Sequence, residues 1–123
     1  MKVIVRITNN FRSELKPLLK KYHSLSNDLI ELETELIQNP HLGTPLGKGV
    51  FKIRLKISSK GKGKSGGARV ITFIESSVMA ITEQSSPQET TVNLLSIYDK
   101  SDIGNISDKE LKNLIKGFHD KSI

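Results

Sequence analysis

Apolar residues in the first third of this chain recur at intervals of three and four positions. Two runs show this spacing: Phe11, Leu15, Leu18, Leu19 and Tyr22, then Leu25, Leu29, Leu32 and Leu36. The spacing places the apolar side chains on one face of a helix. Asn9 and Asn10 suit the start of the first helix, and Ser24 suits the start of the second. Pro17 is expected to shorten or kink the first helix, and Asn39-Pro40 is expected to end the second. The pattern predicts an antiparallel helical hairpin.

The spacing of apolar residues changes after the Gly- and Pro-rich segment 41–49. Residues 50–57 alternate at every second position, which predicts a strand with one apolar and one basic face. The apolar face would hold Phe51, Ile53, Leu55 and Ile57, and the basic face Lys52, Arg54 and Lys56. Residues 3–7, 68–74 and 91–98 are rich in β-branched and apolar residues and predict further strands. Another strand around 78–81 is possible, and residues 85–90 indicate a turn.

The chain is predicted to end in a third helix. Ser107 and Glu110 form an S-x-x-E capping box, and the helix after it would carry Leu111, Leu114, Ile115 and Phe118 on one face. The predicted order is therefore β-α-α-β-β-(β)-β-α, in one domain that spans residues 1–123. Because helices and strands segregate, we expect an α+β fold. Two N-terminal helices would pack on one side of a mainly antiparallel twisted sheet, accompanied by the C-terminal helix, and basic residues would occupy the other side.

Composition narrows the functional classes. The 123 residues include no Cys, which excludes disulfides and thiolate metal sites and suits a cytoplasmic protein. The N-terminus lacks the apolar stretch of a signal peptide, and no run approaches the ~20 apolar residues that a membrane span needs, so we expect no membrane partner. His23, His41 and His119 share no metal-ligand spacing. We therefore expect neither a metal nor any other cofactor.

Positive charge is concentrated in the middle of the chain. The net charge is +6, and no acidic residue lies between Glu35 and Glu75. That interval holds eight cations: Lys48, Lys52, Arg54, Lys56, Lys60, Lys62, Lys64 and Arg69. Such a block favours a polyanionic partner, which could be RNA, DNA, an anionic membrane or an acidic protein. The alternative is a solvated basic surface that keeps the protein soluble.

The basic strand and the loop after it suggest how RNA could be held. Side chains two apart on a strand are separated by about 7 Å, close to the spacing of successive phosphates, so Lys52, Arg54 and Lys56 could contact several phosphates at once. In the loop 58–67, glycines would let the backbone approach RNA, while Lys60, Lys62 and Lys64 add attraction. A mobile hairpin loop is an equally good reading of that segment.

The segments VFKIRL, SKGKGKSGGARVI and LLSIYDKSDIGNISDKEL resemble the RelE/ParE toxin superfamily, and RelE- and HigB-like toxins in particular. The resemblance covers nearly the whole chain, and its most specific part is a G-K-S-G-G-x-R-V segment at residues 63–70. It implies the RelE-like fold and the activity of a type II toxin that cuts mRNA on the ribosome without a metal. The ribose 2′-hydroxyl attacks the adjacent phosphate in that reaction. The implied partners are the ribosome, mRNA and a cognate antitoxin.

The resemblance also implies roles for individual residues. Lys52 and Arg54 look like the basic pair that contacts RNA and eases deprotonation of the nucleophile, and Arg69 looks like the clamp on the scissile phosphate. Lys100 stands where the family has a second arginine. It keeps the charge but lacks the bidentate guanidinium.

The chain departs from the family at Ile106, where RelE has a tyrosine that stacks on the RNA base. Tyr98 could stack instead, and Asp99 could accept a proton. The alternative is that Tyr98 packs in the core and Asp99 begins a turn. Two other functions stay open: a ParE-like, non-enzymatic inhibitor of gyrase, and a nontoxic RNA-binding member of the family.

Overall fold

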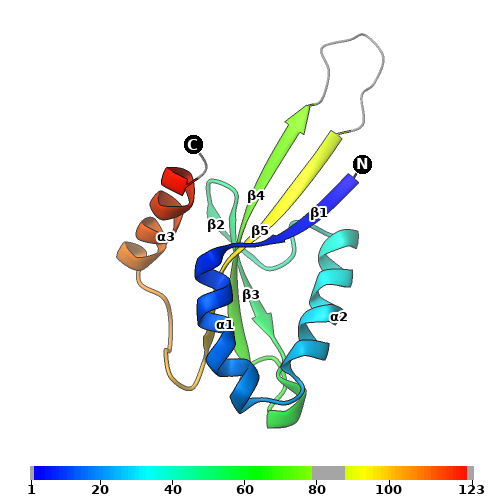
Figure 1. Cartoon of the computed structure of the whole chain (residues 1–123), viewed down its shortest axis with the longest axis vertical. Helices are drawn as coiled ribbons and strands as arrows, with labels where there is room; N and C mark the ends of the chain where they lie inside the picture. Colours follow the sequence, from blue (N-terminus) through cyan, green and yellow to red (C-terminus); the bar gives the residue numbers. More distant parts are fainter. Residues whose placement is uncertain (1, 79–87, 122–123) are drawn as a thin grey trace.

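The computed structural model describes residues 2–78 and 88–121, in which three helices pack against one five-stranded sheet (Figure 1). In chain order these are β1 (Lys2–Ile7), α1 (Asn9–Lys21), α2 (Leu25–Gln38), β2 (Thr44–Gly47), β3 (Val50–Leu55), a 3₁₀ turn (Ser58–Lys60), β4 (Ala68–Val78), β5 (Gln88–Asp99) and α3 (Asp108–Lys121).

Five strands form a mixed sheet in the order β1-β5-β4-β3-β2. β1 runs parallel to β5, whereas the other neighbouring pairs are antiparallel. The register between β4 and β5 shifts between Ile71 and Thr72. Both faces of these central strands carry apolar residues because helices pack against both. The α+β class and the mainly antiparallel character of the sheet are thus confirmed, but in the described part of the chain the fifth strand is β2 and not a strand around 78–81.

Several predicted boundaries are wrong. Part of the segment 41–49 forms the edge strand β2, although its Gly and Pro content predicted a loop. β3 ends at Leu55 and not at residue 57, and residues 88–90 belong to β5 and not to a turn. Of the possible strand at 78–81, only Val78 is described, as the end of β4, and the rest lies outside the described residues, as does 85–87.

The helical hairpin forms as its spacing predicts, with different capping details. Thr8, not Asn9 or Asn10, caps α1, because its side chain accepts a hydrogen bond from the backbone N–H of Phe11. Pro17 lies inside α1 without ending it. Ser24 precedes α2 but makes no side-chain cap bond to the helix backbone, since its hydroxyl donates to Asp28.

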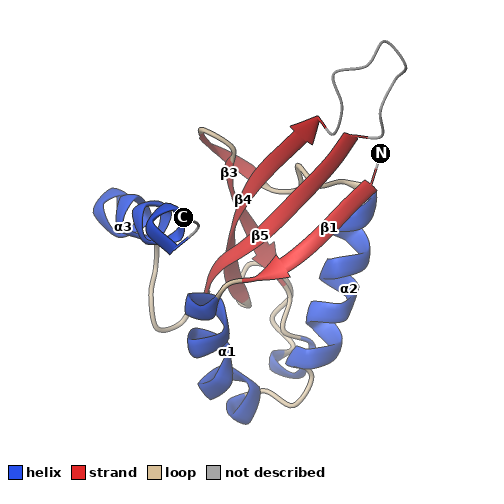
Figure 2. Cartoon of the chain, turned by 45° about the horizontal axis from the view of Figure 1, so that its top comes forward, coloured by secondary structure: helices blue, strands red, loops and turns tan. Residues whose placement is uncertain are grey.

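Each face of the sheet carries its own apolar cluster. The larger one joins α1 and α2 to the sheet through residues such as Phe11, Leu36, Ile53 and Val70. The smaller one lies on the opposite face, where Val50, Ile71, Leu95 and Tyr98 pack against Ile106, Leu111, Ile115 and Phe118 from α3 and the segment before it. Figure 2 shows α3 on one side of the sheet and the hairpin on the other.

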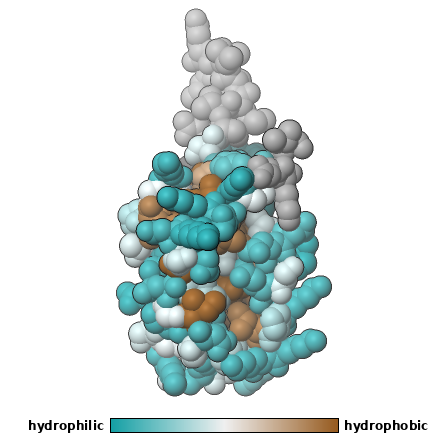
Figure 3. Space-filling view, turned by 90° about the vertical axis from the view of Figure 1, so that its left-hand side faces the viewer, coloured by the Kyte–Doolittle hydropathy of each residue, from teal (hydrophilic) through white to brown (hydrophobic). Residues whose placement is uncertain are grey.

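The position of α3 corrects the prediction that the basic residues occupy the second face of the sheet. Apolar side chains from β3, β4 and β5 lie on that face and need cover, which α3 provides. Viewed from the side of α3, the surface is largely hydrophilic, and apolar residues show only in patches (Figure 3). The basic residues therefore occupy only the part of this face that α3 leaves open. Within the described residues, no helix is both long and apolar enough to cross a membrane.

Two adjacent residues of α2 test the packing of the larger cluster. Leu36 is fully buried, whereas Ile37 is 50% exposed. We expect Leu36→Ala to lower the free energy of unfolding by about 2–5 kcal/mol, because it leaves a cavity between α2 and the sheet. Ile37→Ala should change it by less than about 0.5 kcal/mol. Urea unfolding of the two variants measures both values, and equal losses would contradict this packing.

Candidate functional site

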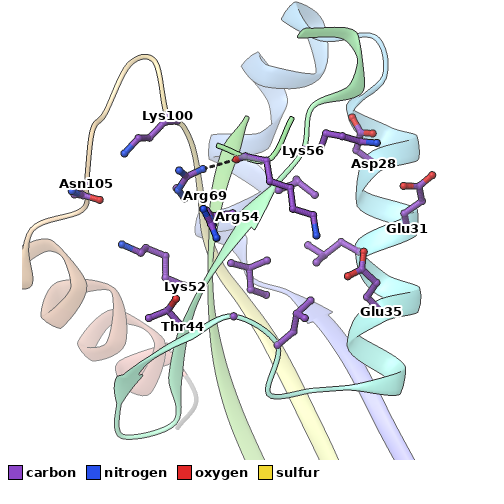
Figure 4. Close-up of a pocket in the computed structure, with 16 residues that line it drawn as sticks. Asp28, Glu31, Glu35, Thr44, Lys52, Arg54, Lys56, Arg69, Lys100 and Asn105 are labelled. Atoms are coloured by element: carbon purple, nitrogen blue, oxygen red, sulfur yellow. Dashed lines mark hydrogen bonds between the residues drawn. The ribbon is translucent and has the colours of Figure 1, made fainter. Parts of the chain in front are cut away.

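A pocket of about 660 Å³ opens over the C-terminal half of β3, between α2 and the loop that follows β5. Basic residues form one wall and acidic residues of α2 form the other (Figure 4). Its charged and polar lining consists of Asp28, Glu31, Glu35, Thr44, Lys52, Arg54, Lys56, Lys64, Arg69, Lys100 and Asn105.

The basic wall is assembled from separate parts of the chain. Arg54 of β3 and Arg69 of β4 are direct cross-strand partners, and Lys52 lies two residues along β3 on the same face. Lys100 comes from the turn after β5. Figure 4 shows these four side chains gathered on one side of β3, with Asn105 beside them. The structure therefore brings Lys52, Arg54, Arg69 and Lys100 together at one surface.

Arg69 is the most buried of these cations, with 5% of its surface exposed. Its Nη1 donates to the carbonyl oxygens of Lys64 and Ala68, each at 3.1 Å, and its Nη2 donates to the carbonyl of Ser65 at 3.3 Å. These neutral acceptors fix the guanidinium in place but leave its positive charge uncompensated. A buried charge without a counter-ion is costly.

The neighbours of Arg69 add to this cost. Like charges directly opposite on paired strands destabilise a sheet, and Arg54 faces Arg69 in that way. Lys100 donates to the carbonyl of Gly104 at 2.8 Å, again a neutral acceptor. Among the described residues, no carboxylate forms an ion pair with any of the four cations. An anion bound in the pocket would reduce the electrostatic repulsion between these cations.

Lys56 does not extend the row of cations, which corrects the prediction of three phosphate contacts along one strand. β3 ends at Leu55, and Figure 4 places Lys56 on the α2 side, beside Asp28. Only Lys52 and Arg54 of the predicted row point to the basic wall.

The acidic wall includes one buried carboxylate and two exposed ones. Asp28 is 4% exposed and accepts hydrogen bonds from the backbone N–H of Ser58 at 2.9 Å, from the Ser58 hydroxyl and from Ser24. Burial alone would raise the pKa of Asp28, but these hydrogen bonds and the charge of Lys56 outweigh it and hold the pKa below its ordinary value. Asp28 thus anchors the 3₁₀ turn, while Glu31 and Glu35 lie exposed at the rim.

The loop 58–67 is anchored at both ends through Lys60. Lys60 donates to Asp99 at 2.8 Å, to the carbonyl of Gly66 at 3.0 Å and to the Ser101 hydroxyl at 2.9 Å. Its ammonium is therefore engaged inside the protein, and the prediction that Lys60 binds RNA is wrong. Lys64 lines the pocket as expected, whereas Lys62 is exposed on the loop and outside the pocket lining.

Tyr98 and Asp99 also differ from their predicted roles. Tyr98 is 5% exposed beneath α3, and its hydroxyl accepts a hydrogen bond from the backbone N–H of Ile106, so no ring face is open for a base. Asp99 is 2% exposed and paired with Lys60. Burial would raise the pKa of Asp99, but hydrogen bonds from Lys60, Tyr22 and Ser101 hold it far below the ordinary value. It is therefore a poor proton acceptor.

Sequence reasoning missed Asn105 and the acidic wall. Asp28, Glu31 and Glu35 follow helical spacing, which could have shown that they share a helix face. Nothing local indicates that this face turns toward β3. Asn105 lies in a loop without a motif, and only the packing of α3 places it beside Lys100.

No family model matches the sequence, and no solved structure matches the fold.

The anchoring of the 3₁₀ turn by Asp28 predicts a dependence of stability on pH. A carboxylate whose pKa is lower in the folded state stabilises the fold above its unfolded pKa, near 3.8, and loses that contribution as the pH falls below this value. We expect Asp28→Asn to be less stable than the wild type near neutral pH, with a smaller further loss in acid. Ser58→Ala removes one hydrogen-bond donor to Asp28. This variant should therefore also be less stable than the wild type near neutral pH and lose less stability in acid. Denaturant unfolding at a series of pH values measures this, and parallel curves for wild type and Asp28→Asn would contradict it.

Proposed function

We propose that this chain is the toxin of a type II toxin–antitoxin pair, a RelE-like endoribonuclease that cuts mRNA on the ribosome. The observation that carries the proposal is the buried, uncompensated guanidinium of Arg69 beside Arg54, Lys52 and Lys100. Four cations without a carboxylate partner in the described residues suit a phosphate group. The resemblance of the segments around these residues to RelE- and HigB-like toxins selects RNA among the possible polyanions.

The proposed reaction is transesterification within the RNA. The 2′-oxygen attacks the adjacent phosphorus, the bond from phosphorus to the 5′-oxygen breaks, and the products carry a 2′,3′-cyclic phosphate and a 5′-hydroxyl. Negative charge builds up on the phosphorane, where positively charged donors lower the barrier. Arg69 would hold the scissile phosphate, and Arg54, Lys52 and Lys100 would stabilise the developing charge.

Proton transfer in this proposal uses water. Tyr98 and Asp99 lie outside the pocket lining, and Asp99 is held ionised in an ion pair. The 2′-hydroxyl would release its proton to a water molecule in the open pocket, and the 5′-oxygen would take up a proton from water. Electrostatic stabilisation by the four cations would then supply most of the acceleration.

The ribosome, mRNA and an inhibitory antitoxin are the partners in this proposal, and the cytoplasm is its location. Contacts to phosphates set affinity and register but read no base, so codon preference would come from other parts of the complex. An antitoxin could neutralise the toxin by covering the basic wall, because RNA could then no longer reach Arg69.

Expression of single variants tests the proposal. Wild-type protein should arrest growth and cleave mRNA in a translating extract. Arg54 is exposed and carries no core packing, so Arg54→Ala should leave the fold intact and lower the cleavage rate about 10²- to 10³-fold. Arg69→Ala should abolish cleavage. Lys16→Ala removes an exposed cation of α1 and should cleave as the wild type does.

Primer extension on mRNA after brief induction reads out the cuts. Absence of translation-dependent cuts with the wild type would refute the nuclease. Growth arrest with a DNA-damage response would then favour a gyrase inhibitor, and harmless expression would favour a nontoxic binding protein.

The salt dependence of RNA binding gives a second prediction. Each cation that neutralises a phosphate of a single strand contributes about 0.7 to the slope of log K against log salt concentration. With a 2′-deoxy-substituted RNA that cannot be cut, Arg54→Ala should therefore reduce the slope by about 0.7 relative to the wild type. Lys16→Ala should keep the wild-type slope. An unchanged slope for Arg54→Ala would mean that Arg54 does not neutralise a phosphate of the bound RNA.

A further inference from the structure

A buried ion pair lies where the loop 58–67 meets the turn after β5, beside the basic wall. Lys60 Nζ and Asp99 Oδ1 are 2.8 Å apart, and their side chains are 9% and 0% exposed. Tyr22 of α1 donates its hydroxyl proton to the other carboxylate oxygen, and the Lys60 ammonium lies 5.2 Å from the centre of the Tyr22 ring. The pair thus connects the loop 58–67, the end of β5 and the end of α1.

The Lys60 side of the pair shapes the loop that holds Arg69. The ammonium donates to the carbonyl of Gly66, which closes the loop on itself. Within this closed loop, the carbonyls of Lys64 and Ser65 accept from the Arg69 guanidinium. Gly67 then runs so close to β3 that a Cβ atom there would overlap the carbonyl oxygen of Leu55. The position of the guanidinium therefore depends on the closure that Lys60 makes.

The Asp99 side shapes the turn that carries Lys100. The Asp99 carboxylate accepts from the backbone N–H of Ser101 at 2.9 Å, and its backbone carbonyl accepts from Asp102 and Ile103. The backbone N–H of Lys100 donates to the carbonyl of Gly67 at 3.1 Å, which joins this turn directly to the first loop. Each charge of the pair thus organises one loop, and the two loops share a hydrogen bond.

We propose that Lys60 and Asp99 are positioning residues, whose buried ion pair locks the 61–67 loop to the 100–105 turn and so fixes Arg69 and Lys100 at one phosphate site. Neither side chain reaches the bound anion. A buried pair stabilises a fold little more than apolar side chains of the same size would, whereas it imposes a specific geometry. The kinetic part of this proposal rests on the proposed ribonuclease activity, and the structural part does not.

Hydrogen exchange tests the structural part. The double variant Lys60→Met/Asp99→Asn removes both charges of the pair together, so neither partner is left buried without the other. We expect the amides of Gly67, Lys100, Ser101 and Ile103 to exchange at least about tenfold faster than in the wild type, while the central strands β4 and β5 keep their protection. Lys16→Met/Glu33→Gln, a matched removal of two exposed charges outside both loops, should leave these four amides as they are in the wild type. Unchanged exchange in the loops, or equal loss over the whole sheet, would overturn the proposal.

Kinetics tests the catalytic consequence. A misplacement of about 1 Å costs on the order of 100-fold in rate, so the double variant should lose about 100-fold in single-turnover RNA cleavage. Affinity for the 2′-deoxy-substituted RNA should change less than about threefold, because Lys52 and Arg54 are placed by β3 alone.

These outcomes separate the two proposals. If the wild-type protein cleaves no RNA, the proposed function fails, and the exchange pattern still decides whether the ion pair locks the loops. If the wild type cleaves and the double variant cleaves equally fast, the positioning role is refuted while the proposed function stands.

Discussion

A positive charge buried without a negative partner is the physical constraint on which this site depends. Arg69 lies within the sheet with carbonyl oxygens as its acceptors, directly opposite a second arginine. In water each guanidinium would be hydrated, and inside the protein that hydration is replaced by a few fixed dipoles. The fold tolerates this because the loop 58–67 closes around the group. The cost of holding like charges together is the strongest physical reason to place an anion at this surface.

The layering of the fold explains why the pocket lies where it does. The helical hairpin packs on one face of the sheet, while α3 covers only an apolar part of the other face. β2 pairs with the beginning of β3 and then stops, so the second half of β3 has an open edge. The pocket forms over this edge, where neither α3 nor β2 fills the space. Basic residues on one side of β3 and acidic residues of α2 on the other give it a strong electrostatic gradient (Figure 4).

Two buried carboxylates have a structural role in this site. Asp28 holds the 3₁₀ turn through Ser58, and Asp99 holds the loops through Lys60. Both retain their charge because hydrogen bonds to the ionised form outweigh the effect of burial. Neither carboxylate neutralises a cation of the basic wall. The acidic groups therefore build the scaffold, and the cations at the pocket stay available to a ligand.

The sequence by itself determined the helical hairpin and the alternation of apolar and basic residues along β3, because side-chain periodicity reports which side of an element is apolar. That Arg69 would join Lys52 and Arg54 came from the resemblance of these segments to a known family and not from periodicity. It did not determine which face α3 would cover, since an apolar helix face can pack on either side of a sheet. The roles of Lys60 and Asp99 were decided by tertiary structure alone. These residues are 39 positions apart. One is a lysine in a basic loop and the other an aspartate at the end of a strand, and neither local sequence predicts that they pair. Both are residue types that usually lie on the surface, and only the tertiary fold buries them as an ion pair. The local sequence pattern contains no information about such long-range pairing.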